Sequence, residues 1–354
     1  MATSQRTRWI PNPLKKIFFI SSFLLITGCN PVVGAINAGN ELIPTIATTT
    51  ELVYLDISTV TPSTLTLPAT ATEIPLKTPE PSPTIQTPDV NVVENPNLYV
   101  PLFDFPIPPE GFRQLETSYR FGSTLYGERI PHDGIEILNP EGTPVLAAED
   151  GVVIFSGNDR TFKRGRFTNF YGNIIIIKHE LKNYPQTIYS MYAHLSELLV
   201  SDNDVVKRGQ TIGLVGASGK AFTNHLHFEV RVGDILLPDA RNPELFLPLI
   251  PSENQPQVGI LIGKLLSING DPIHGASIVV QRVVDGVTQP GSPLYLETYA
   301  KTISGEEKCN ENFVASNIPV GDYRVSTFAY GTFIEQFITI QENEFTFITL
   351  QPEE

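Results

Sequence analysis

Short runs of β-branched and aromatic residues, separated by Gly, Pro and Asn, make up most of the chain from about residue 98 onward. Such runs are typical of β-strands, and no long apolar repeat at helical spacing interrupts them. We therefore expect an antiparallel β domain over residues 99–250, in which residues 196–200 could form one helical turn. The strands are predicted at residues 145–148, 152–156, 173–179, 187–194, 211–215 and 225–232.

A second pattern of short alternating strands begins near Val258 and predicts a small β-sandwich over residues 256–354. Strand-like runs are expected at residues 263–267, 276–284, 333–340 and 345–350, and the run at residues 318–325 belongs to the same pattern. The Asn-Gly-Asp-Pro turn at 269–272 and the Pro-x-Gly-x-Tyr step at 319–323 resemble those of carboxypeptidase-regulatory or transthyretin-like modules. The fold class predicted for the whole chain is all-β.

The N-terminus has the pattern of an export signal. Four basic residues and no acidic one precede an apolar run at 17–26, which is shorter than the roughly 20 residues of a spanning helix. The run ends in Leu-Ile-Thr-Gly followed by Cys29, which resembles a bacterial lipobox. We expect residues 1–28 to be a lipoprotein signal peptide and Cys29 to carry the lipid. The alternative is an ordinary signal peptide with an incidental cysteine.

Residues 29–98 show no sustained period of 2 or 3.6, and half of the residues between 61 and 90 are Thr or Pro. A tract of this composition cannot bury enough apolar surface to offset the entropy of ordering it. It is predicted to be a disordered linker that tethers the folded part to the outer side of the bacterial membrane.

Composition narrows the function classes. The chain has 354 residues, of which 41% are hydrophobic, so it can form substantial cores. Its formal net charge of −14 argues against binding nucleic acid, which requires clustered cations. Two cysteines exclude a framework of several disulfides, and Cys309 is interpreted as a loop thiol without a role.

The histidines carry the chemical signal. In the run His-Leu-His-Phe-Glu, His225 and His227 alternate with apolar residues as in a strand, so both imidazoles point to one face. Two buried histidines side by side without partners would be costly, and a metal site explains them better.

A second cluster lies upstream, where His132 precedes Glu136 by four residues. Helical spacing would align the two side chains, but Pro131, Gly134 and the flanking isoleucines favour an extended or turning segment. In that geometry His132, Gly134 and Glu136 share a face, and the missing side chain at Gly134 leaves room for an ion. Two histidines and one carboxylate form a common zinc-hydrolase ligand set with a fourth position for water.

The segment from about 112 to 232 resembles the lysostaphin-type, LytM-like zinc endopeptidases of peptidoglycan, the family 23 metallopeptidases. The landmarks, in chain order, are His132-x-Gly134, Gly142-Thr143-Pro144-Val145 leading to Ala147-Ala148-x-x-Gly151-x-Val153, Tyr171-Gly172-Asn173, Tyr192-x-His194-Leu195, Gly209-Gln210-x-Ile212-Gly213 and His225-Leu226-His227-Phe228-Glu229.

The resemblance implies that His132, Glu136 and His227 bind Zn²⁺, and that His194 and His225 are catalytic without binding the metal. It leaves open which of these two accepts a proton. The sequence departs from the family at Glu136, where Asp is usual, and at residues 221–224, which replace the usual Ser-Thr-Gly-Pro in one wall of the groove.

The resulting hypothesis is a monomeric zinc endopeptidase that hydrolyses peptidoglycan peptides. Two alternatives remain: a non-catalytic wall-binding or amidase-activating module, and an adhesive lipoprotein. A cell-wall or protein partner of the sandwich stays open, and we expect the sandwich not to contribute to the zinc site. His179, at a strand end or on the surface, and His274, beside a turn, are interpreted as structural. Asp133 is interpreted as solvated or as supporting a ligand.

Overall fold

The structure is a computed structural model that describes residues 98–353 except 183 and 292. The predicted signal peptide, linker and lipidation site at Cys29 lie outside the described residues. Apart from two short 3-10 helices, η1 (Leu237–Asp239) and η2 (Pro243–Leu245), all regular elements are strands. This confirms the all-β prediction. No helix within the described part of the chain is long and apolar enough to cross a membrane.

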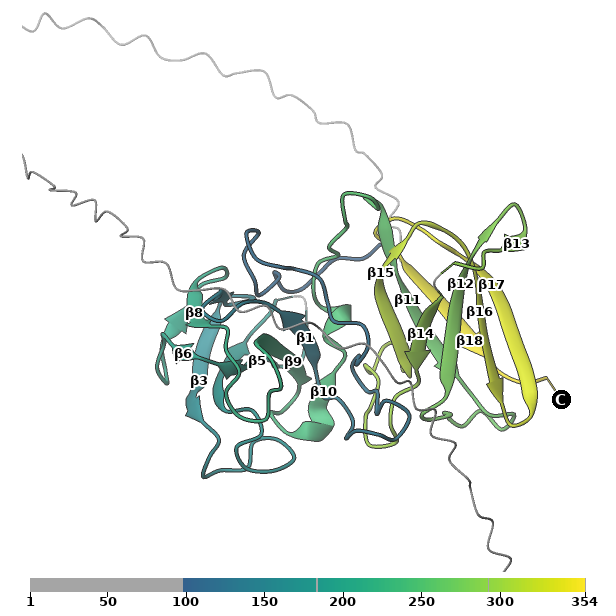
Figure 1. The fold of residues 1–354 in the computed structure, drawn as a ribbon. Coiled ribbons are helices and arrows are strands. Elements are labelled where there is room, and N and C mark those ends of the chain that lie inside the picture. The colour runs from purple at the N-terminus through teal and green to yellow at the C-terminus, as the bar shows by residue number, and fades with distance from the viewer. Residues whose placement is uncertain (1–97, 183, 292, 354) are drawn as a thin grey trace, which may run out of the picture. The chain divides into compact units, whose positions relative to one another are not determined.

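The first half of the described chain forms a large antiparallel sheet with the strand order β1-β9-β5-β4-β3-β7, and β10 also pairs with β9 (Figure 1). Its strands are β1 (Ile135–Leu138), β3 (Gly151–Asn158), β4 (Asn173–His179), β5 (Ile188–Leu195), β7 (Val205–Val206), β9 (His225–Val232) and β10 (Ala240–Arg241). A smaller sheet has the order β2-β8-β6. It consists of β2 (Pro144–Leu146), β6 (Glu197–Leu198) and β8 (Thr211–Leu214).

The helical turn allowed at residues 196–200 is wrong. Residues Glu197 and Leu198 form β6 instead, paired with β8. The amide of Ser196 donates to Leu214 O at 2.9 Å and that of Leu199 donates to Ile212 O at 2.8 Å. Because these donors serve a neighbouring strand, they are not free for helical hydrogen bonds.

Strand β9 is central, and all eight of its residues are buried. Leu226 and Phe228 face the main hydrophobic core, as the alternation predicted. The opposite face carries His225, His227 and Glu229, which are also buried. Burying polar groups in this way is favourable only if they pair with one another or bind a ligand.

The C-terminal part contains two sheets whose facing residues share one hydrophobic core. One sheet has the order β15-β11-β18, formed by β11 (Val258–Leu265), β15 (Phe313–Pro319) and β18 (Phe345–Leu350). The other has the order β13-β12-β16-β17, and β14 also pairs with β12. It is formed by β12 (Ser277–Val284), β13 (Val287–Thr288), β14 (Leu294–Glu297), β16 (Gly321–Ala329) and β17 (Thr332–Ile340). The predicted sandwich is present, while its likeness to the regulatory modules stays a prediction.

Strand β11 joins the two parts of the fold. Leu261 and Leu265 belong to the sandwich core, whereas Ile260 and Ile262 belong to the core of the first part. Each buried isoleucine contributes about 2 kcal/mol to stability through the hydrophobic effect. The described residues accordingly belong to one compact unit, and the predicted division at residues 250–256 stays a prediction.

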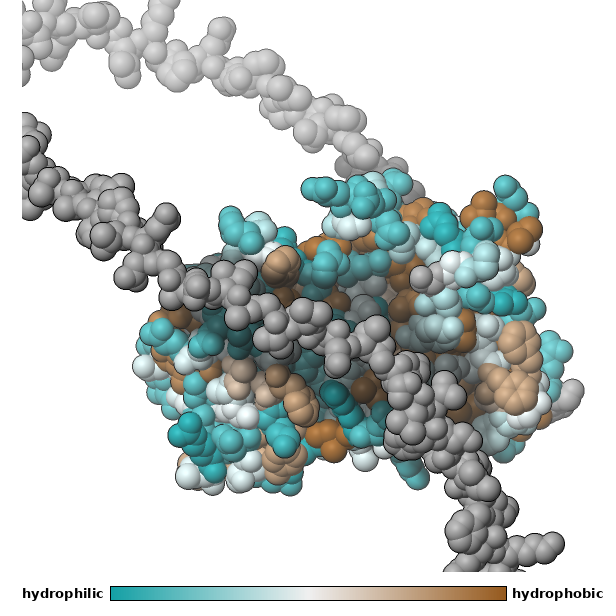
Figure 2. Space-filling view, in the orientation of Figure 1, coloured by the Kyte–Doolittle hydropathy of each residue, from teal (hydrophilic) through white to brown (hydrophobic). Residues whose placement is uncertain are grey.

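The outer face of the sandwich exposes several aromatic residues, and Figure 2 shows hydrophobic side chains at the surface over these strands. Phe328 on β16 and Phe333 on β17 are direct cross-strand partners and are 70% and 56% exposed. Aromatic pairs of this kind stabilise strand pairing and fix its register.

Candidate metal centre

His132, Glu136 and His227 converge on one point at the β1–β9 pair. Each offers one ligand atom, and these atoms all lie within 4.8 Å of one another. Glu136 and His227 are direct partners in the strand register, while His132 lies just before β1. Oε1 of Glu136 is 2.9 Å from His132 Nε2 and 3.1 Å from His227 Nδ1. The structure therefore assembles the predicted ligand set, although the role of each residue stays a prediction.

Gly134 has a different purpose from the one expected. A Cβ at this position would lie 2.5 Å from Phe228 O and 2.9 Å from His227 Nε2. Glycine is thus needed because strand β9 and the His227 ring approach the backbone closely. The missing side chain makes room for this histidine rather than for an ion.

His194 and His225 lie beside the cluster, with their rings 4.8 Å apart. Nδ1 of His194 lies 2.8 Å from Ser218 O, and Nδ1 of His225 lies 2.8 Å from Thr223 O. Since a carbonyl oxygen only accepts, both Nδ1 atoms donate, and Nε2 is the nitrogen of each ring left for chemistry.

The backbone at His194 is strained, with a φ of 62° at the end of β5. A non-glycine residue in this region pays a conformational cost, and such residues are frequent at functional sites. The amide of His194 donates to Tyr171 O at 2.9 Å, which holds the residue in this conformation. The two histidines expected to be catalytic are thus fixed in place by backbone contacts.

Electrostatics separate the histidines into two groups. Burial lowers the pKa of His227, but the charges of Glu136 and Glu229 and their hydrogen bonds outweigh it and raise this pKa to about 10. Burial, together with the neighbouring His227 and His225, lowers the pKa of His194 to about 3. The pKa of Glu136 lies well below its usual range, because nearby histidines outweigh the cost of burial. Glu136 is therefore an anion, and His194 is a neutral imidazole.

A buried network behind the ligands involves Glu229, whose role the sequence analysis did not predict. Its Oε1 lies 3.0 Å from His227 Nε2 and accepts from the hydroxyl of Tyr171. Its Oε2 pairs with the guanidinium of Arg231 at 2.7 Å. When a carboxylate accepts a hydrogen bond from one nitrogen of a ligand histidine, it fixes the tautomer of the ring. The other nitrogen then directs its lone pair toward the metal. The position of Glu229 two residues after His227 on the same strand face was the available signal.

Asp133 is not solvated. It is 2% exposed, and its carboxylate accepts from Arg166 Nε at 3.0 Å and from Arg166 Nη2 at 2.7 Å. This ion pair ties the ligand-bearing segment to the loop between β3 and β4. Tyr119 also supports this segment, because its ring stacks on His132 with a centroid distance of 4.3 Å.

The two remaining histidines lie outside the cluster. His179 ends β4 as expected, but it is fully buried, not at the surface, and its Nε2 is 2.7 Å from Ser190 Oγ. His274 is exposed, with Nδ1 donating to Tyr299 O at 3.0 Å. Both environments agree with structural roles.

The cluster opens into a groove of about 690 Å³. Its lining residues come from the segments 116–138, 167–170 and 220–227, together with His194. Tyr119, Arg129 and Phe222 all line this groove, and Phe222 comes from the segment where the sequence departs from the family. The Arg129 guanidinium lies 5.2 Å from the Tyr119 ring and 5.5 Å from the Phe222 ring. It therefore makes cation–π contacts with both aromatic rings.

The residues of the cluster fit a zinc ion. Within the described part of the chain, His132 Nδ1 and Glu136 Oε2 are buried without a hydrogen-bond partner, since His225 Nε2 lies 2.9 Å from Oε2 without hydrogen-bond geometry. Imidazole and carboxylate are the donors that zinc takes in catalytic sites. A metal beside Glu136 would also offset the cost of leaving its Oε2 unpaired.

The fold and the site define a β-sheet protein with a two-histidine, one-carboxylate cluster that could hold a metal ion, in an open groove. Residues 130–238 match Peptidase family M23. This match over residues 130–238 confirms the resemblance found in the sequence.

Similar proteins include the DD-carboxypeptidase/endopeptidase Mpg of Neisseria meningitidis, which is 37% identical over 32% of this chain and 23% of Mpg. The murein hydrolase activator NlpD of Salmonella dublin is 33% identical over 43% of this chain and 34% of NlpD. A solved structure, the catalytic domain of lysostaphin from Staphylococcus simulans, is 28% identical over 36% of this chain and 89% of that domain, with a TM-score of 0.31. The chain thus spans about a quarter of Mpg and about a third of NlpD.

Proposed function

We propose that the chain is a zinc-dependent endopeptidase that hydrolyses peptide bonds of bacterial peptidoglycan. The observation that carries the proposal is the convergence, in one groove, of three metal-binding side chains with two histidines that are not needed as ligands. The name of Mpg supports this substrate class. The same substrate supports action outside the cytoplasm, where the predicted anchor at Cys29 would hold the enzyme.

His132, Glu136 and His227 would hold the zinc ion. When bound, zinc supplies a positive charge that polarises a carbonyl group and lowers the pKa of water. Glu229 keeps the proton of His227 on Nε2, so that the lone pair of Nδ1 is free to bind the metal. Asp133, through its ion pair with Arg166, keeps the ligand segment in position.

His194 and His225 would manage the protons of the reaction. Their Nδ1 atoms are engaged by carbonyl oxygens, so each ring can exchange a proton only through Nε2. One histidine, with a neutral ring, accepts a proton from the attacking water through Nε2, and the other, protonated on both ring nitrogens, donates a hydrogen bond to the oxyanion that develops on the substrate. Which of them does which stays open.

The second candidate function is a non-catalytic wall-binding or activator module. It is favoured by Glu136, which stands where the family usually has Asp, and by the name of the relative NlpD. The longer side chain moves the carboxylate by about 1 Å unless the backbone adjusts, and shifts of that size can matter for rate.

Metal content and wall digestion of Glu136 variants distinguish the two candidates. We expect Glu136→Gln to lose zinc or nearly all hydrolysis, because a neutral amide balances none of the metal charge. Glu136→Asp should retain zinc and some activity. Zinc is measured by mass spectrometry, and activity by mass analysis of the muropeptides released from purified peptidoglycan. Equal zinc content in wild type and Glu136→Gln, with no hydrolysis by either, would favour the binding module.

A further inference from the structure

We propose that Glu297 of the C-terminal sandwich positions the loop that carries the metal ligand His132, so that the sandwich completes the metal centre. Glu297 touches neither the groove nor the ligands, and is therefore a positioning residue. The inference rests on the proposed function, because it concerns the same metal site. It replaces the expectation that the sandwich does not contribute to that site.

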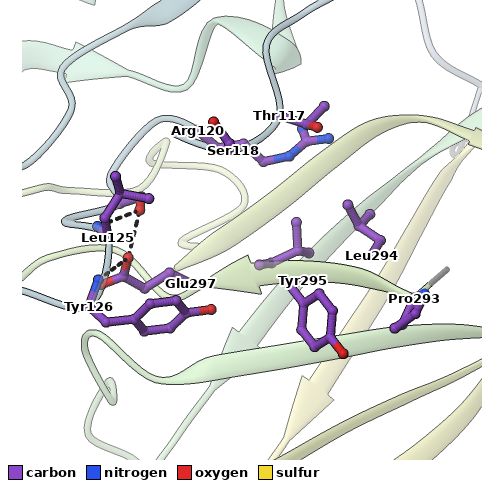
Figure 3. A pocket seen from close by; sticks show the side chains of 11 residues that line it. Thr117, Ser118, Arg120, Leu125, Tyr126, Pro293, Leu294, Tyr295 and Glu297 are labelled. Atoms are coloured by element: carbon purple, nitrogen blue, oxygen red, sulfur yellow. Dashed lines mark hydrogen bonds between the residues drawn. The ribbon is translucent and has the colours of Figure 1, made fainter. Parts of the chain in front are cut away.

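Glu297 ends strand β14 and reaches the loop at residues 120–132, as Figure 3 shows beside Leu125 and Tyr126. Its Oε2 accepts from Ser123 Oγ at 2.6 Å, from the Thr124 amide at 3.0 Å and from the Tyr126 amide at 3.2 Å. Its Oε1 accepts from Thr124 Oγ1 at 2.7 Å. One carboxylate thus takes four hydrogen bonds from three neighbouring residues of the loop.

The loop needs such an acceptor because its tip is strained. Leu125, Tyr126 and Gly127 follow one another with φ angles of 49°, 57° and 91°. Left-handed backbone is unfavourable for residues with a Cβ. The amides of Leu125 and Gly127 donate to the hydroxyls of Ser123 and Thr124, and both hydroxyls in turn donate to Glu297. Together with the direct bond from the Tyr126 amide, Glu297 stabilises a conformation that the loop sequence itself disfavours.

Backbone hydrogen bonds within the loop connect the residues that bind Glu297 to the metal ligand His132. Beyond the tip, the chain returns alongside its first arm, and the amide of Arg129 donates to Thr124 O at 2.8 Å. The amide of His132 donates to Ser123 O at 3.0 Å, and the amide of Gly122 donates to His132 O at 2.8 Å. The backbone of His132 is therefore held by the two residues that precede Thr124, one of which also binds Glu297.

A second contact from the sandwich reaches the same arm. The amide of Ala300 donates to Gly122 O at 2.8 Å, and the ring of Tyr299 packs edge-on against Phe121 with a centroid distance of 5.2 Å. A Cβ at Gly122 would lie 2.4 Å from the Tyr299 ring, so the approach is as close as glycine permits. Residues 297–300 thus fix both the tip and the base of the loop.

The test compares four forms of the full chain with wild type. Glu297→Ala removes all four hydrogen bonds, whereas Glu297→Gln keeps one acceptor oxygen and should rescue part of the effect. Glu335→Ala, on β17 of the same sheet, is the matched control, since Glu335 is exposed and lies 3.5 Å from Arg324. Adding Tyr126→Gly to Glu297→Ala relieves strain at the tip and should restore order.

Two readouts are used, both at a temperature well below unfolding. Hydrogen exchange of the metal-free protein reports directly on the loop, and we expect faster exchange in Glu297→Ala confined to residues 119–134. Titration with Co²⁺, followed by its visible absorption, should show an affinity about tenfold weaker, as when supporting contacts of ligands are removed. Glu297→Gln should lie between Glu297→Ala and wild type.

The proposal would be overturned if Glu297→Ala had the same hydrogen exchange and the same Co²⁺ affinity as Glu335→Ala. It would also be overturned if hydrogen exchange in Glu297→Ala became faster evenly over the whole chain. If wild type bound no Co²⁺, the proposed zinc enzyme would fail, while exchange at residues 119–134 would still decide whether Glu297 positions the loop. If wild type bound Co²⁺ and cut no peptidoglycan, only the proposed activity would be lost.

Discussion

Replacing Glu229 with Gln tests whether a buried carboxylate sets the tautomer of His227. Glu229 is fully buried between His227 and Arg231. A glutamine can direct its single oxygen toward the guanidinium, and its amide then faces His227 Nε2. That nitrogen must accept rather than donate, so the imidazole proton moves to Nδ1, the atom that faces Glu136. The variant would block the nitrogen that binds the metal.

The size of the effect follows from the same contacts. Loss of a carboxylate behind a ligand histidine typically weakens metal binding 10- to 100-fold. The metal-free protein should also lose stability, because burial raises the pKa of Glu229 but Arg231 and His227 outweigh it and lower this pKa to about 2. A carboxyl pKa lowered in the folded state stabilises the protein above the unfolded pKa, so the contribution is complete at pH 7 and amounts to about 3 kcal/mol.

The assay combines metal titration with urea unfolding of the metal-free protein at pH 7. Tyr171→Phe is the control, because it removes the hydroxyl that Glu229 accepts from without changing any charge. We expect Tyr171→Phe to lose far less metal affinity than Glu229→Gln. Wild-type affinity and unchanged stability in Glu229→Gln would refute the reasoning.

Three further predictions follow from other sites. His225→Ala should keep its metal but lose turnover of peptidoglycan, whereas loss of the metal would make His225 a ligand. Burial lowers the pKa of His179 to about 4, so the folded state excludes a proton that the unfolded chain binds below pH 6.5. Stability should therefore fall by about 2 kcal/mol more in wild type than in His179→Gln between pH 8 and pH 5, measured by urea unfolding; parallel profiles would contradict this. Cys29→Ser should release the protein from the membrane fraction or leave the signal peptide uncleaved, and unchanged detergent partitioning would argue against the anchor.

The sequence predicted the fold class and a shared face for His225 and His227 because both depend on local periodicity, whereas the assignment of the metal ligands came from the resemblance to a known family. Alternation along β9 placed His225 and His227 on one face and Leu226 on the other, and a strand has few other ways to satisfy that pattern. Pairing of β1 with β9 then brought Glu136 opposite His227. The extended geometry favoured for residues 132–136 led to the same grouping of side chains.

The supporting contacts could not be predicted in this way, because they join residues far apart in the chain. The sequence left Asp133 either solvated or supporting a ligand, and only the loop between β3 and β4, which places Arg166 beside it, decides against solvation. His179 appeared to lie at a strand end near the surface, but the packing of β5 buries it against Ser190. Single-sequence patterns give the face on which a residue lies but not what covers that face.

The sequence by itself determined most of the strands and their polar faces, since these depend on residue types at fixed short spacings, and its resemblance to a known family predicted the metal-binding side chains. Only the tertiary structure decided how these side chains are held. Glu229 is buried between His227 and Arg231, and Glu297 meets the loop at Tyr126 from a strand more than 150 residues away. The reason is physical: a carboxylate stabilises whichever donors surround it, and which donors do so depends on the packing of the two parts of the fold.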